Sequence, residues 1–216
     1  MSQHVISGLG SISKLMKILE DEHAKNILVV TGKKSYFKSG SAEALKPIFD
    51  KFNVFKFNDF EINPKIEDAI KGTKIARSNN IDTILSIGGG SVMDFVKALA
   101  IVDSNGGSIT DYEFGKREIN KCKPIYLCPS TCGSGSEVTQ YVVINNSETG
   151  RKFTIANEKV CATQAAIDPI LLTMLGTKNL VEPALDAFTH CLEALLNKNS
   201  KDAVYKYSLE GLKLSL

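Results

Sequence analysis

This sequence lacks several features that would assign a protein to a class at once, and each absence is informative. No apolar run approaches the roughly 20 residues of a membrane-spanning helix, so no such helix is predicted. Residues 1–15 contain no basic region followed by an apolar core, so no signal peptide is expected. The formal net charge is only +2 and no basic block occurs, so neither nucleic acid nor an anionic membrane is expected as a partner.

Cysteine is scarce and shows no pairing pattern. The five cysteines are odd in number and include no Cys-x-x-Cys pair, which favours free thiols and a cytoplasmic location over a disulfide framework. The remaining composition is ordinary for a soluble globular protein. Of its 216 residues, 43% are hydrophobic and 23% are charged, which is enough for a sizeable core.

Apolar runs alternate with helix-like segments along most of the chain. This alternation predicts an α/β fold, in which a Rossmann-like parallel sheet carries helices on both faces. A hairpin, with a turn at 146–150, is expected beside that sheet. The predicted strands are 26–32, 53–58, 82–90 and 123–130, the helices are 40–52, 65–80 and 91–102, and the hairpin strands are 140–146 and 151–158.

The pattern changes near residue 178, where helical periodicity replaces the alternation. Apolar positions stay in phase through the last helix to Leu214 and Leu216, and no capping residue or polar tail follows. We therefore predict an α/β domain over residues 1–177. Residues 178–216 would begin a truncated all-α domain, of which this chain carries only a part.

Three glycines stand between the third predicted strand and its helix, in the stretch SIGGGSVMDF. Gly88, Gly89 and Gly90 leave the turn without side chains, and the helix that begins near Ser91 directs free backbone N–H groups into it. Such a turn favours an anion such as a phosphate, although a plain strand-to-helix turn also uses glycine. The Rossmann G-x-G-x-x-G and Walker lysine motifs are absent, so a nucleotide here would belong to another binding class.

Two further segments carry polar side chains suited to chemistry. The hydroxyl-rich stretch PSTCGSGSEVT follows the fourth predicted strand, and it is either a flexible surface loop or part of a ligand site at the carboxyl end of the sheet. Asp186 and His190 lie four residues apart on one helix face, so both could reach one divalent metal ion. They also share a polar stripe with Glu193 and Asn197, which is the pattern of a solvated helix face.

Together these motifs resemble the iron-containing (group III) alcohol dehydrogenases, which have the dehydroquinate-synthase-like fold. The glycine segment fits the family pattern G-G-G-S-x-x-D-x-x-K at every position, and the first segment is similar to the family's opening strand. The segments that carry the resemblance are GLGSISKL, GGGSVMDFVKALA, PSTCGSGSEVT, AAIDPILL and LDAFTHCLEA.

The resemblance implies an oxidoreductase that transfers a hydride between NAD or NADP and a small alcohol or aldehyde. The glycine turn would hold the pyrophosphate, the serine-rich loop would face the adenine and ribose, and a lysine would lie near the nicotinamide ribose. Asp94 and Lys97 would brace the turn, or else be exposed helix residues. The implied cofactor-binding residues are Asn63, Gly88, Gly89, Gly90, Ser91, Asp94, Ser130, Thr131, Ser134 and Lys152.

The resemblance also implies a metal, Fe²⁺ in most members and Zn²⁺ in some, that acts as a Lewis acid on the substrate oxygen. Asp186 and His190 would be its ligands and the catalytic residues. The family's site uses one aspartate and three histidines, whereas this chain contains only His4, His23 and His190. Half a site should hold metal weakly. A homo-oligomer, with a dimer as its simplest form, is also expected.

The loop after the first predicted strand bears on the choice of cofactor. In the family, an aspartate at this point accepts hydrogen bonds from the adenosine ribose and repels a 2′-phosphate, as the acidic ribose residue of Rossmann proteins does. Gly32 occupies the position here, and Lys33, Lys34 and Ser35 follow it. Two positive charges and a hydroxyl favour NADP(H) over NAD(H), although paired loop lysines are also common as solvated residues.

Three alternatives stay open. The chain could be a non-catalytic remnant that only binds a dinucleotide, or a phosphonoaldehyde reductase of the same fold. It could also be a glycerol dehydrogenase, although that group usually lacks the GSGSEVT type of loop.

Overall fold

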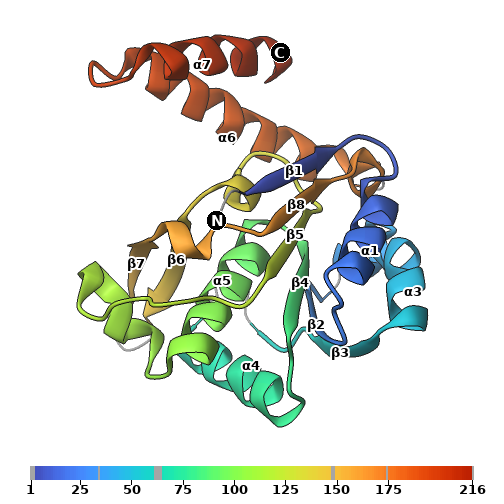
Figure 1. Ribbon diagram of the computed structural model, residues 1–216. Coiled ribbons are helices and arrows are strands. Elements are labelled where there is room, and N and C mark those ends of the chain that lie inside the picture. The colour runs from blue at the N-terminus through green and yellow to red at the C-terminus, as the bar shows by residue number, and fades with distance from the viewer. Residues whose placement is uncertain (1–2, 34, 61–64, 147–148, 174, 216) are drawn as a thin grey trace.

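Six parallel strands form the central sheet of the computed structural model, which describes residues 3–33, 35–60, 65–146, 149–173 and 175–215 (Figure 1). The strand order is β1-β8-β5-β4-β2-β3, and each neighbouring pair is parallel. The strands are β1 (His4–Ser7), β2 (Asn26–Thr31), β3 (Asn53–Phe57), β4 (Thr83–Gly88), β5 (Ile125–Pro129) and β8 (Gln164–Ile167).

Helices cover both faces of the sheet, which confirms the predicted fold class (Figure 1). Val29 and Leu85 point toward α1 and α3, whereas their neighbours Val30 and Ile84 point toward α4 and α5. A strand buried on both faces has a continuous apolar sequence, as the ILVV segment of β2 does. The helices are α1 (Ser11–Asp21), α2 (Ser35–Lys38), α3 (Ser41–Lys51), α4 (Ile66–Ser78) and α5 (Gly90–Asn105).

The predicted hairpin forms, but its predicted place was wrong. Strands β6 (Tyr141–Asn146) and β7 (Arg151–Ala156) pair antiparallel in a separate sheet, and part of their predicted turn lies outside the described residues. Val142 and Ile155 pack with Ala98 and Ile101 on the side of α5 that faces away from the parallel sheet. Because α5 is apolar nearly all round, its outer side needs a cover of its own, and the hairpin supplies it.

The N-terminal part of the sheet was predicted less well. The resemblance placed an opening strand in GLGSISKL, but β1 lies just before it, and the glycines instead turn the chain into α1. The edge pair β1 and β8 was not identified from periodicity because each strand has only four residues. Short 3₁₀ turns connect the remaining elements: η1 (Ile109–Gly115), η2 (Ser136–Val138), η3 (Glu158–Val160) and η4 (Pro169–Leu172).

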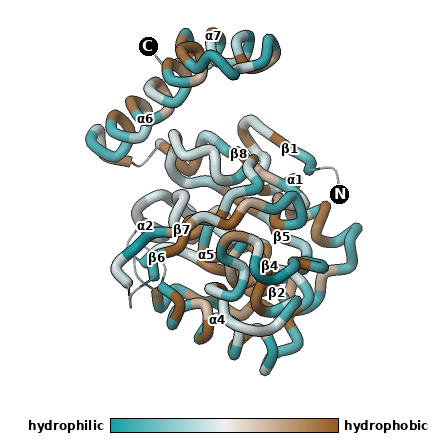
Figure 2. The backbone as a smooth tube through the Cα atoms, turned by 90° about the vertical axis from the view of Figure 1, so that its left-hand side faces the viewer, coloured by the Kyte–Doolittle hydropathy of each residue, from teal (hydrophilic) through white to brown (hydrophobic). Residues whose placement is uncertain are grey.

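Two helices, α6 (Thr177–Leu196) and α7 (Asp202–Ser215), pack on each other and stand off the sheet (Figures 1 and 2). Figure 2 shows hydrophobic residues along both of them as well as in the central strands. None of the residues of α6 is buried, and several large apolar side chains of the pair are exposed: Val181, Leu185, Leu192, Leu196, Tyr207, Leu209 and Leu214. Within the described ranges, no helix combines the length and apolar character needed to cross a bilayer.

Candidate functional site

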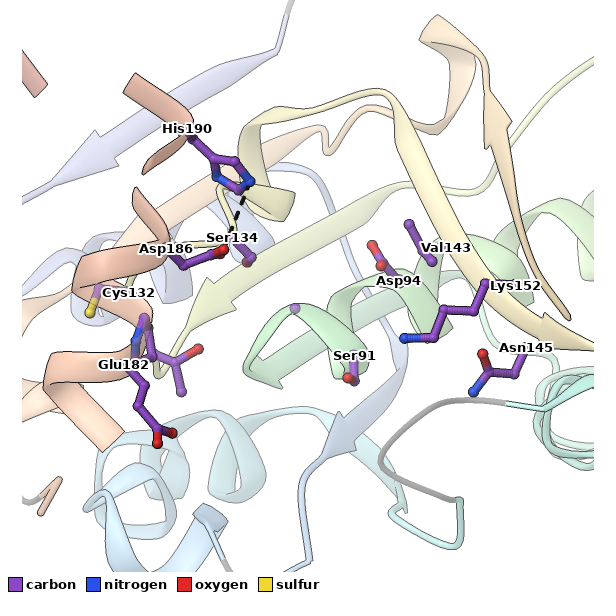
Figure 3. Close-up of a pocket in the computed structure, with 13 residues that line it drawn as sticks. Ser91, Asp94, Cys132, Ser134, Val143, Asn145, Lys152, Glu182, Asp186 and His190 are labelled. Atoms are coloured by element: carbon purple, nitrogen blue, oxygen red, sulfur yellow. Dashed lines mark ion pairs between the residues drawn. The ribbon is translucent and has the colours of Figure 1, made fainter. Parts of the chain in front are cut away.

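A cleft of about 770 Å³ opens at the carboxyl edge of the parallel sheet, where β4 and β5 end (Figure 3). Its walls come from the start of α5, the loop after β5, the hairpin and α6. The lining residues are Gly90, Ser91, Asp94, Thr131, Cys132, Ser134, Val143, Asn145, Lys152, Glu182, Pro183, Asp186 and His190. Segments far apart in the sequence therefore meet at the edge where open α/β sheets bind ligands.

The glycine turn forms the floor at one end of the cleft. β4 ends at Gly88, Gly89 caps α5, and α5 begins at Gly90, one residue before the predicted start. A Cβ atom on Gly89 would lie 2.8 Å from the Thr131 hydroxyl oxygen, and one on Gly90 would lie 3.0 Å from that of Ser134. The turn and the serine-rich loop thus approach each other too closely for side chains. The N-terminus of α5 with its free N–H groups lies at this point, which suits an anion.

The serine-rich loop contributes two of its three predicted hydroxyl residues to the cleft. Thr131 and Ser134 line it, whereas Ser130 is only 2% exposed and its backbone N–H donates to the Gly88 carbonyl at 2.9 Å. Gly88, Gly89 and Ser130 are not among the described lining residues. The bond between Ser130 and Gly88 joins the ends of β5 and β4, and the burial of Ser130 differs from its predicted direct contact with the cofactor.

Asp94 and Lys97 are not exposed helix residues, and in the described part of the chain their side-chain hydrogen bonds run to residues 136–143 rather than to the glycine turn. Lys97 is fully buried, and its ammonium group donates to the carbonyls of Ser136, Thr139 and Tyr141 at 2.6, 2.8 and 3.0 Å. The Ser136 hydroxyl donates to the Asp94 carboxylate at 2.7 Å. Both residues therefore brace the segment that leads into β6, because that segment lies across the outer side of α5.

Burial shifts the pKa values of Asp94 and Lys97 in opposite directions. It raises the pKa of Asp94, an effect that the Ser136 hydrogen bond, the charge of Lys97 and the Val143 N–H oppose. It lowers the pKa of Lys97, with the charges of Asp94, Cys161 and Glu137 opposing it. Desolvation of the charged form dominates at each site.

The hairpin presents its polar face to the cleft. Asn145 and Lys152 are direct cross-strand neighbours, and Val143 precedes them on the same face of β6. In Figure 3 the Lys152 side chain extends from β7 toward Ser91 at the start of α5. Lys152 is therefore placed on the wall opposite the glycine turn.

Asp186 and His190 lie on the α6 wall, and Figure 3 shows both at the cleft. The His190 Nε2 atom is 3.9 Å from Asp186 Oδ1, and the side chains are 58% and 55% exposed. One carboxylate oxygen and one imidazole nitrogen are donors that Fe²⁺ and Zn²⁺ accept. In the described part of the chain, however, no group of three or more His, Cys, Asp or Glu side chains is placed to hold a metal ion. The pair fits a divalent metal in kind but supplies only half a coordination shell.

The loop predicted to select the cofactor is not among the described lining residues, but it lies at the same edge of the sheet, because Thr31 at the end of β2 pairs with Ile87 in β4. Gly32 directly follows β2 and Lys33 is exposed, whereas Lys34, Asn63 and the side chain of Ser35 lie outside the description. The structure adds a cation that the sequence did not suggest. Lys56 Nζ lies 3.8 Å from the centre of the Tyr36 ring, and Lys56 sits beside Val29 near the carboxyl end of β3.

The other lining residues that were not predicted could in part have been found. Val143 and Asn145 alternate with the buried Val142 and Ile144, so strand periodicity alone puts them on the open face. Cys132 belongs to the hydroxyl-rich motif already identified. Glu182 and Pro183 gave no such signal, since they enter the cleft only because α6 lies over the serine-rich loop.

The contact between α6 and that loop is close. Gly133 has a φ of +107°, and a Cβ atom there would clash with the carbonyl oxygen of Pro183. The Cys132 thiol lies 3.7 Å from the Leu180 carbonyl oxygen. Only glycine suits both the backbone conformation and the space at residue 133.

Comparison with known proteins identifies the class that this fold and cleft define. The family model described as iron-containing alcohol dehydrogenase matches residues 2–169. The chain therefore belongs to the iron-containing alcohol dehydrogenase family.

Its relatives agree on the family and differ in substrate. Alcohol dehydrogenase 4 of Saccharomyces cerevisiae is 30% identical over 209 residues, which are 96% of this chain and 54% of that protein. The NAD-dependent methanol dehydrogenase of Bacillus methanolicus is 29% identical over 97% of this chain and 55% of its own length. The chain thus spans about half the length of these curated relatives.

Solved structures of similar proteins also match nearly all of this chain and just over half of their own length. An alcohol dehydrogenase from Oenococcus oeni superposes with a TM-score of 0.93 at 25% identity, over 98% of this chain and 56% of that one. A sulfoacetaldehyde reductase from Bifidobacterium kashiwanohense, solved in complex with NAD⁺, gives a TM-score of 0.89 at 27% identity, over 100% and 57%.

Proposed function

We propose that this chain binds a nicotinamide dinucleotide across the carboxyl edge of its sheet and serves hydride transfer to or from a small alcohol or aldehyde. The observation that carries the proposal is the cleft itself, in which a helix N-terminus, two hydroxyl groups and Lys152 lie opposite Asp186 and His190. The family and the NAD-linked relatives support the same assignment.

Each wall has a separate task in this proposal. Backbone N–H groups at Gly90 and Ser91 hold the pyrophosphate, which no side chain of the turn obstructs. Thr131 and Ser134 offer hydroxyls to the adenosine side, and Lys152 reaches the ribose on the nicotinamide side. The protein's contribution is to hold the dinucleotide between the hairpin and α6, because orientation of the reacting groups lowers the barrier.

The α6 wall is the proposed place of the substrate. Asp186 and His190 are the residues that would hold Fe²⁺ or Zn²⁺, and such a metal supplies Lewis-acid polarisation of the alcohol or aldehyde oxygen. Two donors leave the site incomplete, and this favours a second candidate, a chain that binds dinucleotide without turning over. A turnover assay with added metal and several small aldehydes separates the two candidates.

The position of the dinucleotide can be tested through Cys132, which lines the cleft. NADPH at saturation should slow alkylation of Cys132 by iodoacetamide, on the order of tenfold, because bound ligand blocks access to the thiol. Cys161 is a matched internal control, since it is also partly exposed but lies outside the cleft. Cys122 should react slowly in both cases, because burial raises its pKa to about 12. An unchanged Cys132 rate with bound NADPH would place the cofactor elsewhere.

We also propose that NADP(H) is preferred over NAD(H). Gly32 removes the repulsion of a 2′-phosphate, Lys33 is exposed beside it, and Lys56 adds a further positive charge near the same edge. NADPH should bind about tenfold more tightly than NADH, as expected for one or two charge-assisted contacts. Gly32→Asp should reverse the order, and Lys33→Ala should weaken only NADPH.

Dissociation constants for both cofactors on one preparation decide this prediction. Lys46→Ala, an exposed lysine of α3, serves as a charge-matched control and should change neither constant. Equal or tighter binding of NADH by the unaltered chain would refute the preference without affecting the location of the cleft.

A further inference from the structure

The most unusual group outside the cleft lining is the ammonium of Lys97, which is 0% exposed in the middle of α5. A buried charge is costly unless it is fully hydrogen-bonded. Three main-chain carbonyls receive it at 2.6 to 3.0 Å, which matches the three N–H donors of an ammonium group. The hydroxyls of Ser136 and Thr139 lie slightly farther away, at 3.3 and 3.4 Å.

These bonds join the middle of α5 to a segment that follows β5 in the sequence. The carbonyls belong to residues 136, 139 and 141, which run from η2 at the end of the serine-rich loop to the first residue of β6. The Ser136 hydroxyl also donates a hydrogen bond to Asp94. The Asp94 side chain lines the cleft, one turn before Lys97 on α5. One cation therefore anchors the segment that links Ser134 on one wall with Val143 on another.

We infer that Lys97 is a positioning residue for the dinucleotide cleft: its buried ammonium fixes the 136–141 segment and, through Ser136, the Asp94 carboxylate. It lies outside the described lining of the cleft, so it acts through the residues it holds. The inference rests on the proposed function for its effect on cofactor binding, whereas its effect on the segment and on Asp94 is independent of any cofactor.

The decisive variant is Lys97→Met, which keeps most of the side-chain volume and leaves the carbonyls without their donor. Amide hydrogen exchange at Val138, Thr139 and Val143 should accelerate at least about tenfold relative to amides of β4, because the segment opens locally. The dissociation constant for NADPH should rise by about tenfold. Lys46→Met, on the exposed side of α3, is the matched control and should change neither quantity.

If Lys97 only stabilised the fold as a whole, its replacement would not change the pKa of Asp94. Lys97 faces Asp94, Glu137 and Cys161, and its positive charge is one of the factors that hold the pKa of Asp94 down against burial. The pKa of Asp94, followed by carboxyl ¹³C NMR, should therefore rise in Lys97→Met. Ser136→Ala, which removes only the connecting hydroxyl, should also raise it.

The outcomes are separable. Unchanged exchange in the segment and an unchanged Asp94 pKa in folded Lys97→Met overturn the inference. If that variant does not fold, Ser136→Ala decides, and unchanged Val143 exchange with an unchanged Asp94 pKa overturns it equally. An unaltered chain that binds no dinucleotide refutes the proposed function. The exchange and NMR measurements would still test whether Lys97 holds the 136–141 segment and Asp94 in place.

Discussion

Gly89→Val is expected to weaken dinucleotide binding severely while the sheet stays folded. Even the first carbon of a side chain at this position would lie 2.8 Å from the Thr131 hydroxyl oxygen. A branched side chain would separate the glycine turn from the serine-rich loop and fill the place proposed for the pyrophosphate. We expect the affinity for NADPH to fall on the order of 100-fold, or about 3 kcal/mol. Fluorescence titration with NADPH measures the loss, and circular dichroism checks the fold.

Gly176→Ala provides a control at a glycine without close neighbours. A methyl group on Gly176 would meet no described atom within 4 Å, and its φ of −67° is open to any residue. This variant should bind NADPH like the unaltered chain. Undiminished affinity in folded Gly89→Val would contradict the location of the pyrophosphate at the turn between β4 and α5.

The 216-residue chain is expected to hold Fe²⁺ or Zn²⁺ only weakly. Asp186 and His190 supply two donors on an exposed helix face, and the described residues near them contain no further group suited to complete the shell. Losing ligands removes both affinity and control of geometry. After metal loading and dialysis, elemental analysis should find less than about 0.1 equivalent of metal per chain.

Calorimetric titration with Zn²⁺ should show a weak site that depends on these two residues. His190→Ala and Asp186→Ala should each remove the remaining binding, because one donor does not hold the ion against water. Glu193→Ala changes an acidic residue of the same helix that lies outside the cleft lining, and it should have no effect. Stoichiometric metal after dialysis would contradict the prediction that Asp186 and His190 are the only metal ligands that the described residues supply.

Much of the parallel core could be predicted from the sequence because its signals are local. β2, β4 and β5 are short, mostly apolar runs, and the periodicity of 65–80 and 91–102 identified α4 and α5. β1 and β8 escaped prediction because four residues carry no reliable period. The hairpin was recognised from its alternation, but its docking on α5 depends on a packing contact between Val142, Ile155 and Ala98 that no local pattern encodes.

The candidate site divides in the same way. By itself the sequence determined the bare turn at Gly89, the hydroxyl-rich loop and the spacing of Asp186 and His190, since each depends on neighbouring residues or on one helical turn. Only the tertiary structure decided that these segments share one cleft with Asn145 and Lys152, that Ser130 is buried, and that the Lys97 ammonium is buried among main-chain carbonyls. Those facts depend on how α5, the hairpin and α6 pack around the carboxyl edge of the sheet, and packing between distant segments is set by the whole fold.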